Sequence, residues 1–119
     1  MEVIVKYIKV LLEKRKFRTP INEEVTSREE GICITLNTHL VTKNNVEVSL
    51  TPREYQILKV FLENKGVTLS RQEIINVVWG NPVEEIDERT IDLHIKNIRS
   101  KLDIVSLITV RGYGYKWNE

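Results

Sequence analysis

The chain has 119 residues, of which 41% are hydrophobic and 29% charged, with a formal net charge of +1. A chain of this length buries a single core and leaves no room for a second full domain. No apolar run approaches the ~20 residues that cross a bilayer, and the N-terminal stretch lacks the basic start of a signal peptide. The one cysteine, Cys33, excludes an intramolecular disulfide and a CxxC zinc motif. We therefore expect a cytoplasmic protein without a metal or cofactor.

Charge alternates in blocks along the chain. Residues 1–18 carry a net positive charge and residues 23–30 a net negative charge. An acidic segment, residues 81–88, then precedes a basic one, residues 89–102. Positive charge gathered near the C-terminus of a nearly neutral chain indicates a local contact surface, and it argues against a uniformly basic nucleic-acid coat.

The N-terminal third predicts a helix, a linker and strands. Within residues 1–16, apolar side chains at helical spacing predict an amphipathic helix. Residues 17–30 are polar and indicate a linker, with the folded domain beginning at residue 31. Alternation over residues 32–37 and 46–50 predicts half-buried antiparallel strands, with residues 39–43 lying between them. Asn44 and Asn45 suit a tight turn because Asn tolerates positive φ.

Capping boxes mark the starts of two further helices. Thr51, followed by Pro52 at the first helical position, pairs with Glu54, and Ser70 pairs in the same way with Glu73. Each helix is followed by a glycine, the residue that most easily adopts the left-handed conformation of a helix C-terminus. Residues 51–66 and 70–80 therefore predict two short helices in succession.

A third helix is predicted over residues 88–102, with Asp87 as its cap. Its core stripe consists of Ile91, Ile95, Ile98 and Leu102. The opposite face carries Arg89, Thr90, Leu93, Lys96, Asn97, Ser100 and Lys101. Bases that neutralise phosphates, an Asn that bonds adenine and a Leu that packs on a thymine methyl are typical of a helix in the DNA major groove. A solvated basic face with one stray Leu is the competing interpretation.

The chain ends in a hairpin pattern over residues 107–117. Its tip is formed by Arg111, Gly112 and Tyr113. A narrow ribbon with an arginine at its end can place the guanidinium in the minor groove while the preceding helix occupies the major groove. A phosphate-cradling glycine loop is the alternative, but a GxG pattern without a following helix is a weak signal.

Four segments together resemble a known family. They read LTPREYQILKVFLENKG, SRQEIINVVWG, DERTIDLHIKNIRSKL and ITVRGYGYKW. In this order and spacing they resemble the effector domain of OmpR/PhoB-type response regulators over residues 31–119. The resemblance implies an α+β winged helix-turn-helix fold, with an N-terminal four-stranded antiparallel sheet, three helices and a C-terminal hairpin, the wing. It also implies that residues 1–16 are similar to the last helix of a receiver domain, so that the chain looks like a fragment of a longer regulator.

The same resemblance implies roles for individual residues. Phosphate or backbone contacts are implied for Trp79, Arg89, Thr90, Thr109 and Tyr115. His94, Lys96 and Asn97 would face the major groove and Arg111 the minor groove. With the exposed residues noted above, the predicted DNA-binding set is Trp79, Arg89, Thr90, Leu93, His94, Lys96, Asn97, Lys101, Thr109, Arg111, Gly112, Tyr113 and Tyr115. Asn97 stands where other members carry an arginine, which favours adenine over guanine there.

Further partners follow from the resemblance alone. The segment 80–87 matches the part of the family that touches RNA polymerase, with Asn81, Glu84 and Glu85 as candidates. The family also implies a sensor kinase, promoter DNA with direct repeats, and a head-to-tail homodimer. These partners are expectations that no pattern of charge or periodicity requires.

Three functions from different classes remain open from the residues. The first is a sequence-specific DNA-binding transcriptional regulator without enzymatic activity. The second is a winged-helix module that contacts protein or RNA, and a preference for duplex DNA would distinguish the two. The third is a small hydrolase or nuclease, which needs a His or carboxylate cluster; the only acid cluster is the segment 84–88, and DNA cleavage on addition of magnesium would reveal the activity. His39 and His94 are too far apart in sequence to make a metal site. Asp92 has a structural interpretation, pairing with Lys96 at i+4 or with a sheet residue.

Overall fold

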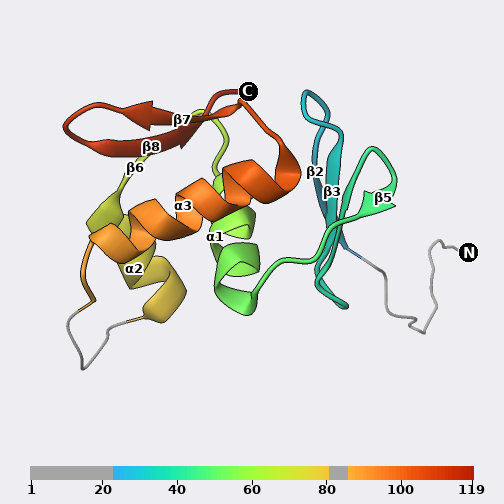
Figure 1. Ribbon diagram of the computed structural model, residues 1–119, viewed down its shortest axis with the longest axis horizontal. Coiled ribbons are helices and arrows are strands. Elements are labelled where there is room, and N and C mark those ends of the chain that lie inside the picture. The colour runs from blue at the N-terminus through green and yellow to red at the C-terminus, as the bar shows by residue number, and fades with distance from the viewer. Residues whose placement is uncertain (1–22, 81–85) are drawn as a thin grey trace, which may run out of the picture.

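The structure, a computed structural model, describes residues 23–80 and 86–119 (Figure 1). In chain order, these residues form β2 (Glu24–Ser27), β3 (Ile32–Thr35), β4 (Leu40–Lys43), β5 (Val46–Glu47), α1 (Pro52–Glu63), β6 (Thr68–Ser70), α2 (Arg71–Trp79), α3 (Arg89–Leu102), β7 (Leu107–Val110) and β8 (Gly114–Trp117). Two antiparallel sheets, β2-β3-β4-β5 and β6-β8-β7, flank the helices, and α3 crosses in front of α1 (Figure 1). This arrangement confirms the predicted α+β winged-helix architecture. The predicted N-terminal helix lies outside the described residues.

The first sheet confirms the predicted alternation and turn. Ile32 and Ile34 of β3 are buried, whereas Cys33 between them is only half-buried. Asn44 and Asn45 join β4 to β5 with φ of 52° and 68°. Two consecutive positive φ values are those of the hairpin turn that matches the twist of antiparallel strands.

Two strands of this sheet depart from the prediction. β4 occupies residues that were predicted to lie between strands, and β2 occupies part of the predicted linker, residues 17–30, so the predicted domain start at residue 31 is wrong. β2 carries a polar buried side chain, Ser27, which hydrophobic alternation cannot detect. The Ser27 hydroxyl donates to Glu119 Oε1 at 2.6 Å, so a partner far along the chain holds this strand.

The first two helices begin as the capping boxes predict. The Thr51 side chain accepts from the Glu54 N–H, and the Glu54 carboxylate accepts from the Thr51 N–H. Ser70 and Glu73 make the same reciprocal pair at the start of α2, and Gly80 follows α2 with φ of 80°. Each box satisfies two backbone N–H groups that a helix N-terminus otherwise leaves unpaired.

The third helix is α3, and it begins at Arg89, one residue later than predicted. The N-cap is Glu88, whose side chain makes no capping bond, so the predicted cap, Asp87, lies one residue too early. The Asp87 Oδ1 still accepts from the Arg89 N–H at 2.9 Å. The predicted core stripe is confirmed. It comprises the buried residues Ile91, Ile95, Ile98 and Leu102.

The C-terminal hairpin is confirmed and extended by a third strand. β8 pairs with β7 on one side and with β6 on the other, so α2 begins directly from a strand of this sheet. Gly114 makes that pairing possible, since a Cβ at this position would lie 2.0 Å from the Leu69 carbonyl oxygen. Only glycine, which has no Cβ, allows two strands to approach this closely.

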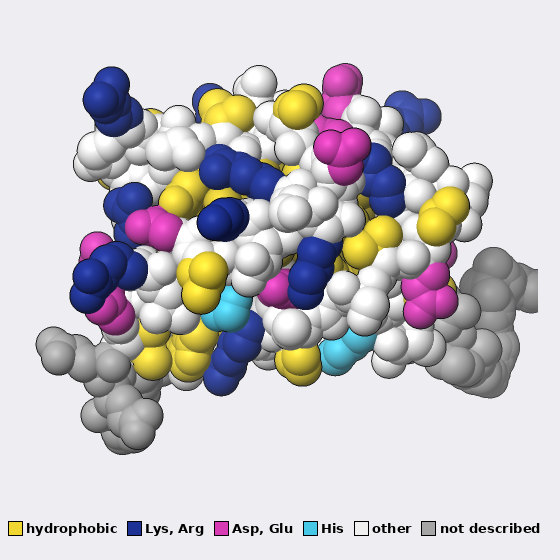
Figure 2. Space-filling view, viewed as in Figure 1, with side chains coloured by type: hydrophobic (Ala, Val, Ile, Leu, Met, Phe, Trp, Pro, Cys, Tyr) yellow, Lys and Arg dark blue, Asp and Glu magenta, His cyan; other side chains and the backbone are white. Residues whose placement is uncertain are grey.

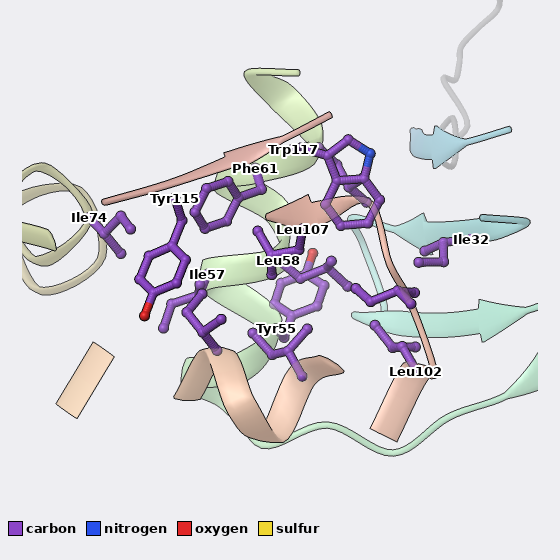
Figure 3. Close-up of a cluster of buried hydrophobic side chains, with 14 of the residues drawn as sticks. Ile32, Tyr55, Ile57, Leu58, Phe61, Ile74, Leu102, Leu107, Tyr115 and Trp117 are labelled. Carbon is purple, nitrogen blue, oxygen red and sulfur yellow. The ribbon is translucent and has the colours of Figure 1, made fainter. Parts of the chain in front are cut away.

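One hydrophobic core joins all three helices to both sheets. Phe61 and Leu58 of α1 lie in its middle, with Trp117 from the second sheet and Ile32 from the first on one side and Ile74 of α2 on the other (Figure 3). Tyr115 reaches into the same core from β8 (Figure 3). The sheets and helices therefore fold as one unit, and the surface of α3 has a fixed position relative to the wing.

An ion pair from the first sheet holds the C-terminus of α3. Lys43 Nζ donates to the carbonyl oxygens of Leu102 and Asp103, both at 2.8 Å. Glu30, 3.5 Å from Lys43, accepts the N–H groups of the following loop, Val105 at 2.9 Å and Ser106 at 2.7 Å. Burial disfavours the Glu30 carboxylate, but these hydrogen bonds outweigh it and lower its pKa. The pair satisfies backbone groups on both sides of the helix end.

We expect Lys43→Met and Glu30→Gln each to lower the free energy of unfolding by about 1–3 kcal/mol, because each leaves backbone groups or a charge without a partner. The losses should be less than additive, with a coupling of about 1 kcal/mol, because both residues hold the same loop. Urea denaturation of the two single variants and the double variant measures this. Lys59→Met, which removes an exposed pair with Glu63, is the matched control. Strict additivity would contradict the shared role.

Candidate nucleic-acid interface

The side of α3 turned away from the core is a continuous outward strip. It consists of the exposed residues Arg89, Leu93, Lys96 and Ser100. Spacings of three and four residues place them on one side of the helix, and Leu93 keeps 57% of its surface exposed. The half-buried residues along its edge are Thr90, His94 and Asn97. The structure thus brings these predicted α3 residues together on one surface.

Asp92 fastens α3 to both α2 and the wing. Its Oδ1 accepts from Arg71 Nε at 2.7 Å and from the Tyr115 hydroxyl at 2.5 Å. Partial burial disfavours the charge, but these two hydrogen bonds outweigh it and lower the pKa of Asp92. Burial and the bond to Asp92 raise the pKa of Tyr115, so the phenol stays protonated and donates. Asp92 pairs with a sheet residue and not with Lys96.

Arg99 makes a second connection between α3 and the wing. Its Nε donates to the Leu107 carbonyl at 2.9 Å and its Nη2 to the Thr109 hydroxyl at 3.1 Å. Arg71 and Arg99 both lie over the Tyr115 ring, 5.6 and 5.5 Å from its centroid. Thr109 is exposed, whereas Tyr115 is buried and bonded to Asp92. Of these two predicted contact residues, Tyr115 serves first to hold the wing against α3.

On the opposite side of α3, an arginine and two aromatic rings lie together. Trp79, at the end of α2, has its ring 6.1 Å from that of His94, tilted by 40°. The Arg53 guanidinium, from the first turn of α1, lies 4.6 Å from the Trp79 ring centroid. Burial lowers the pKa of His94, with Glu54 opposing and Arg53 adding to the effect. The neutral imidazole is therefore favoured at this position.

Lys101, which was predicted to bind DNA, has a partner inside the protein. Its Nζ lies 2.7 Å from Oε1 of Glu54, a carboxylate that is almost fully buried. Burial disfavours the Glu54 charge, but the bonds from Lys101 and Thr51 outweigh it and lower its pKa. The ammonium of Lys101 thus neutralises a buried acid, and its side chain stays only partly exposed.

At the start of α3, Arg89 carries a strongly exposed charged side chain. Its guanidinium contacts the Asp87 carboxylate, with Nη2 2.8 Å from Oδ2, while the Arg89 side chain remains 87% exposed. Such an exposed pair is weak in water. Arg89 can therefore exchange this carboxylate for another anion.

The wing tip is exposed, as predicted. Arg111, Gly112 and Tyr113 connect β7 to β8, and all three are exposed. Gly112 takes φ of 77°, and the Tyr113 N–H closes the turn on the Val110 carbonyl at 3.0 Å. Arg111 therefore stands at the end of a narrow, well-formed hairpin.

Basic side chains gather on the face that carries α3 (Figure 2). Besides the predicted residues, Arg53, Arg71 and Arg99 contribute to it through the contacts described above. Arg53 and Arg71 each lie just after a helix cap, and no sequence pattern separates them from ordinary surface bases. In the sequence, Arg53, Arg71 and Arg99 look the same as the other basic residues of these helices. The sequence analysis therefore did not predict these three arginines.

Other expectations concern residues or chemistry elsewhere in the chain. Asn81, Glu84 and Glu85 lie outside the described residues, so the RNA polymerase contact stays a prediction. Among residues 23–80 and 86–119, no group of three or more His, Cys, Asp or Glu is placed to hold a metal ion. Burial raises the pKa of Cys33, which disfavours a reactive thiolate. In the same part of the chain, no helix has the length and apolarity needed to span a membrane.

We expect the folded domain to lose stability in acid because Asp92 becomes protonated. Its pKa is lower in the folded state than the ordinary 3.8, so its stabilising contribution is complete above that value and is lost as the pH falls through the folded pKa. We expect Asp92→Asn to lower the free energy of unfolding by about 1 kcal/mol near neutral pH, because solvent screens this half-exposed pair. Between about pH 7 and about pH 3 the variant should lose less stability than the wild type.

Urea denaturation at a series of pH values tests this, with Glu63→Gln as a control that removes an exposed carboxylate of α1. An equal acid-induced loss in wild type and Asp92→Asn would contradict the role of Asp92.

Comparison with known proteins places this surface in a family. The family described as "Transcriptional regulatory protein, C terminal" matches residues 45–117. TorR, the TorCAD operon transcriptional regulatory protein of Escherichia coli O157:H7, is 32% identical over 96 residues, which cover 81% of this chain and 42% of TorR. The response regulator ArlR of Staphylococcus aureus is 40% identical over 89 residues, covering 71% of this chain and 40% of ArlR.

A solved structure is similar over most of the described fold. The DNA-binding domain of the response regulator AdeR, in complex with an intercistronic region, has a TM-score of 0.67 and 31% identity, covering 75% of this chain and 95% of that one. The chain belongs to the OmpR/PhoB-type family of response regulators and contains its C-terminal DNA-binding domain. The family consists of transcriptional regulators and not of enzymes. The matched part spans about two fifths of the full-length relatives.

Proposed function

We propose that this domain binds duplex DNA sequence-specifically, with α3 in the major groove and Arg111 of the wing in the minor groove. One observation carries the proposal: Asp92 and Arg99 fix the wing to α3, so that the outward strip and the wing tip form one rigid surface. A rigid surface engages two grooves without losing further conformational freedom on binding.

The outward strip has the composition that a major-groove helix needs. The groove is about 12 Å wide and admits an α-helix, whose side chains then reach the base edges. Lys96 and half-buried Asn97 offer donors and acceptors for bases, and exposed Leu93 offers an apolar contact for a thymine methyl. Arg89 and Thr90 lie at the helix start, where they would contact phosphates on one side of the groove.

The wing supplies the second groove contact. Arg111 lies at the exposed tip of the hairpin, where Gly112 forms the tight turn with a positive φ. A narrow minor groove attracts a guanidinium through its enhanced negative potential. Tyr113 and Thr109 are exposed beside it and would contact the sugar-phosphate backbone. The AdeR domain, which is similar in fold and sequence, is bound to DNA in its structure. That likeness supports the same activity here.

The rest of the proposal concerns the whole regulator. Because the relatives are more than twice as long as the matched part, we propose that residues 1–16 end a receiver domain and that the residues before β2 form the interdomain linker. A sensor kinase would act on that receiver, and two domains would bind direct repeats head to tail in the cytoplasm. The acidic segment containing Asn81, Glu84 and Glu85 would meet a basic surface of RNA polymerase.

Salt-dependent binding tests the central proposal. We expect the chain to bind random duplex DNA in preference to the matching single strand, with a slope of log affinity against log salt on the order of −4 to −6. Arg111→Ala should make this slope shallower by about one, because one phosphate or groove contact is lost. Fluorescence anisotropy over a salt series measures the slope, and Lys59→Ala, which removes a base paired within α1, should leave it unchanged.

The alternative function is a winged-helix module for protein or RNA. Tighter binding to the single strand would favour RNA contact and refute the proposal. If the chain does not bind duplex DNA at low salt, the binding measurement is repeated with a forced dimer of the chain. Continued absence in that dimer would point to a protein partner.

Asn97→Ala tests base reading separately from affinity. Its loss should relax the preference at one base pair and cost about 1–3 kcal/mol on the selected site, with little change on random duplex. Selection of binding sites by wild type and variant, followed by anisotropy on single-base substitutions, measures this. Equal weakening on every sequence would defeat the assignment of Asn97 to a base.

A further inference from the structure

The first turn of α1 carries a base whose position helix stability does not explain. Arg53 is the second residue of α1, and a cation near a helix N-terminus opposes the helix dipole. Its Nη1 donates to the Val78 carbonyl and to the Gln56 side chain, both at 3.1 Å. These bonds hold the guanidinium across the Trp79 ring at 4.6 Å.

We propose that Arg53 makes a further phosphate contact where α1 meets the end of α2, beside Trp79, whose own backbone contact the family resemblance already implies. The proposal rests on the proposed function, because the phosphate is one of the DNA backbone beside α3. Arg53 supplies a charge and a guanidinium fork next to the contact that the resemblance implies for Trp79. The recognition surface then has a third anchor besides the start of α3 and the wing.

The guanidinium has the donors for this role. Both hydrogen bonds that Arg53 makes among the described residues use Nη1, so Nε and Nη2 have no partner within that part of the chain. A guanidinium carries five N–H groups in a planar fork that matches two phosphate oxygens. The stacked indole restricts the plane of the fork, which lowers the conformational cost of binding.

The local charge is also favourable. Glu54, the acid next to Arg53, is buried and accepts from Lys101 at 2.7 Å and from the Thr51 N–H at 2.9 Å. Its negative charge is therefore neutralised within the protein. His94, the next ring along from Trp79, has a lowered pKa caused first by its burial. Arg53 is left as the uncompensated cation of this cluster.

The location connects the site to the recognition surface. Arg53 lies over Trp79, and Trp79 lies 6.1 Å from His94 of α3, so the three side chains run from α1 across α2 to the helix that would enter the groove. The wing lies on the other side of α3, held through Asp92. A helix in the major groove has one phosphate backbone on each side, and this cluster faces the backbone that the wing does not reach.

Anisotropy over a salt series with the 119-residue chain and duplex DNA separates a phosphate contact from a purely structural role. Arg53→Gln should make the salt slope shallower by about 0.9 and weaken binding about eightfold near 0.1 M salt. Arg53→Lys should keep the slope and lose only part of the affinity, because the charge remains. Trp79→Phe should weaken binding without changing the slope. Lys59→Gln, a base of α1 that pairs with Glu63, is the matched control.

Acrylamide quenching gives a readout on the unaltered chain. Trp117 is fully buried and Trp79 is half-buried, so accessible tryptophan emission comes from Trp79. Duplex DNA should protect this emission from quenching. Unchanged quenching on DNA binding would overturn the proposal even if Arg53→Gln fails to fold.

The outcomes distinguish the two proposals. An Arg53→Gln variant with the wild-type slope, beside an Arg111→Ala variant with a reduced one, would overturn the Arg53 site and leave the proposed function standing. Failure of the wild type to bind duplex, in the monomer and in the forced dimer, would overturn both.

Discussion

The carboxylate of Asp92 is the interaction on which the recognition surface depends. It accepts from Arg71 at the start of α2 and from Tyr115 of β8, and thus joins the helix that carries it to two other elements. Without this link, only the Arg99 bonds to Leu107 and Thr109 would tie α3 to the wing outside the shared core. With it, their relative position is fixed by hydrogen bonds to a charged group, which are stronger than neutral ones.

The C-terminal end of α3 is fixed by different chemistry. Lys43 and Glu30, from the first sheet, satisfy carbonyl and N–H groups around the last turn. The helix is thus held near its start by Asp92 and at its end by a half-buried ion pair, while its outward strip makes none of these structural bonds. The fold uses the sides and the end of α3 for stability and leaves its outward strip for recognition.

Local signals predicted local structure well. The capping boxes at Thr51 and Ser70, the turn at Asn44 and the core stripe of α3 all depend on residues within one or two turns of each other, and each was confirmed. β2 was missed because its buried residue, Ser27, is polar and finds its partner at Glu119. The same limit hid Arg53, whose partner Trp79 is distant in sequence. Asp92 had two possible partners by spacing, and only the tertiary fold selects Tyr115.

The contact between Ser27 and Glu119 has a consequence for how the domain is made. The two residues are 92 positions apart, so closing this contact requires almost the whole domain to be in place. During synthesis β2 leaves the ribosome early, but the carboxylate that completes its burial comes late. Contacts at such separation slow folding, because chain entropy is lost before the contact forms. In the nascent domain, the Ser27 hydroxyl and the Arg28 N–H therefore lack this carboxylate until translation reaches Glu119.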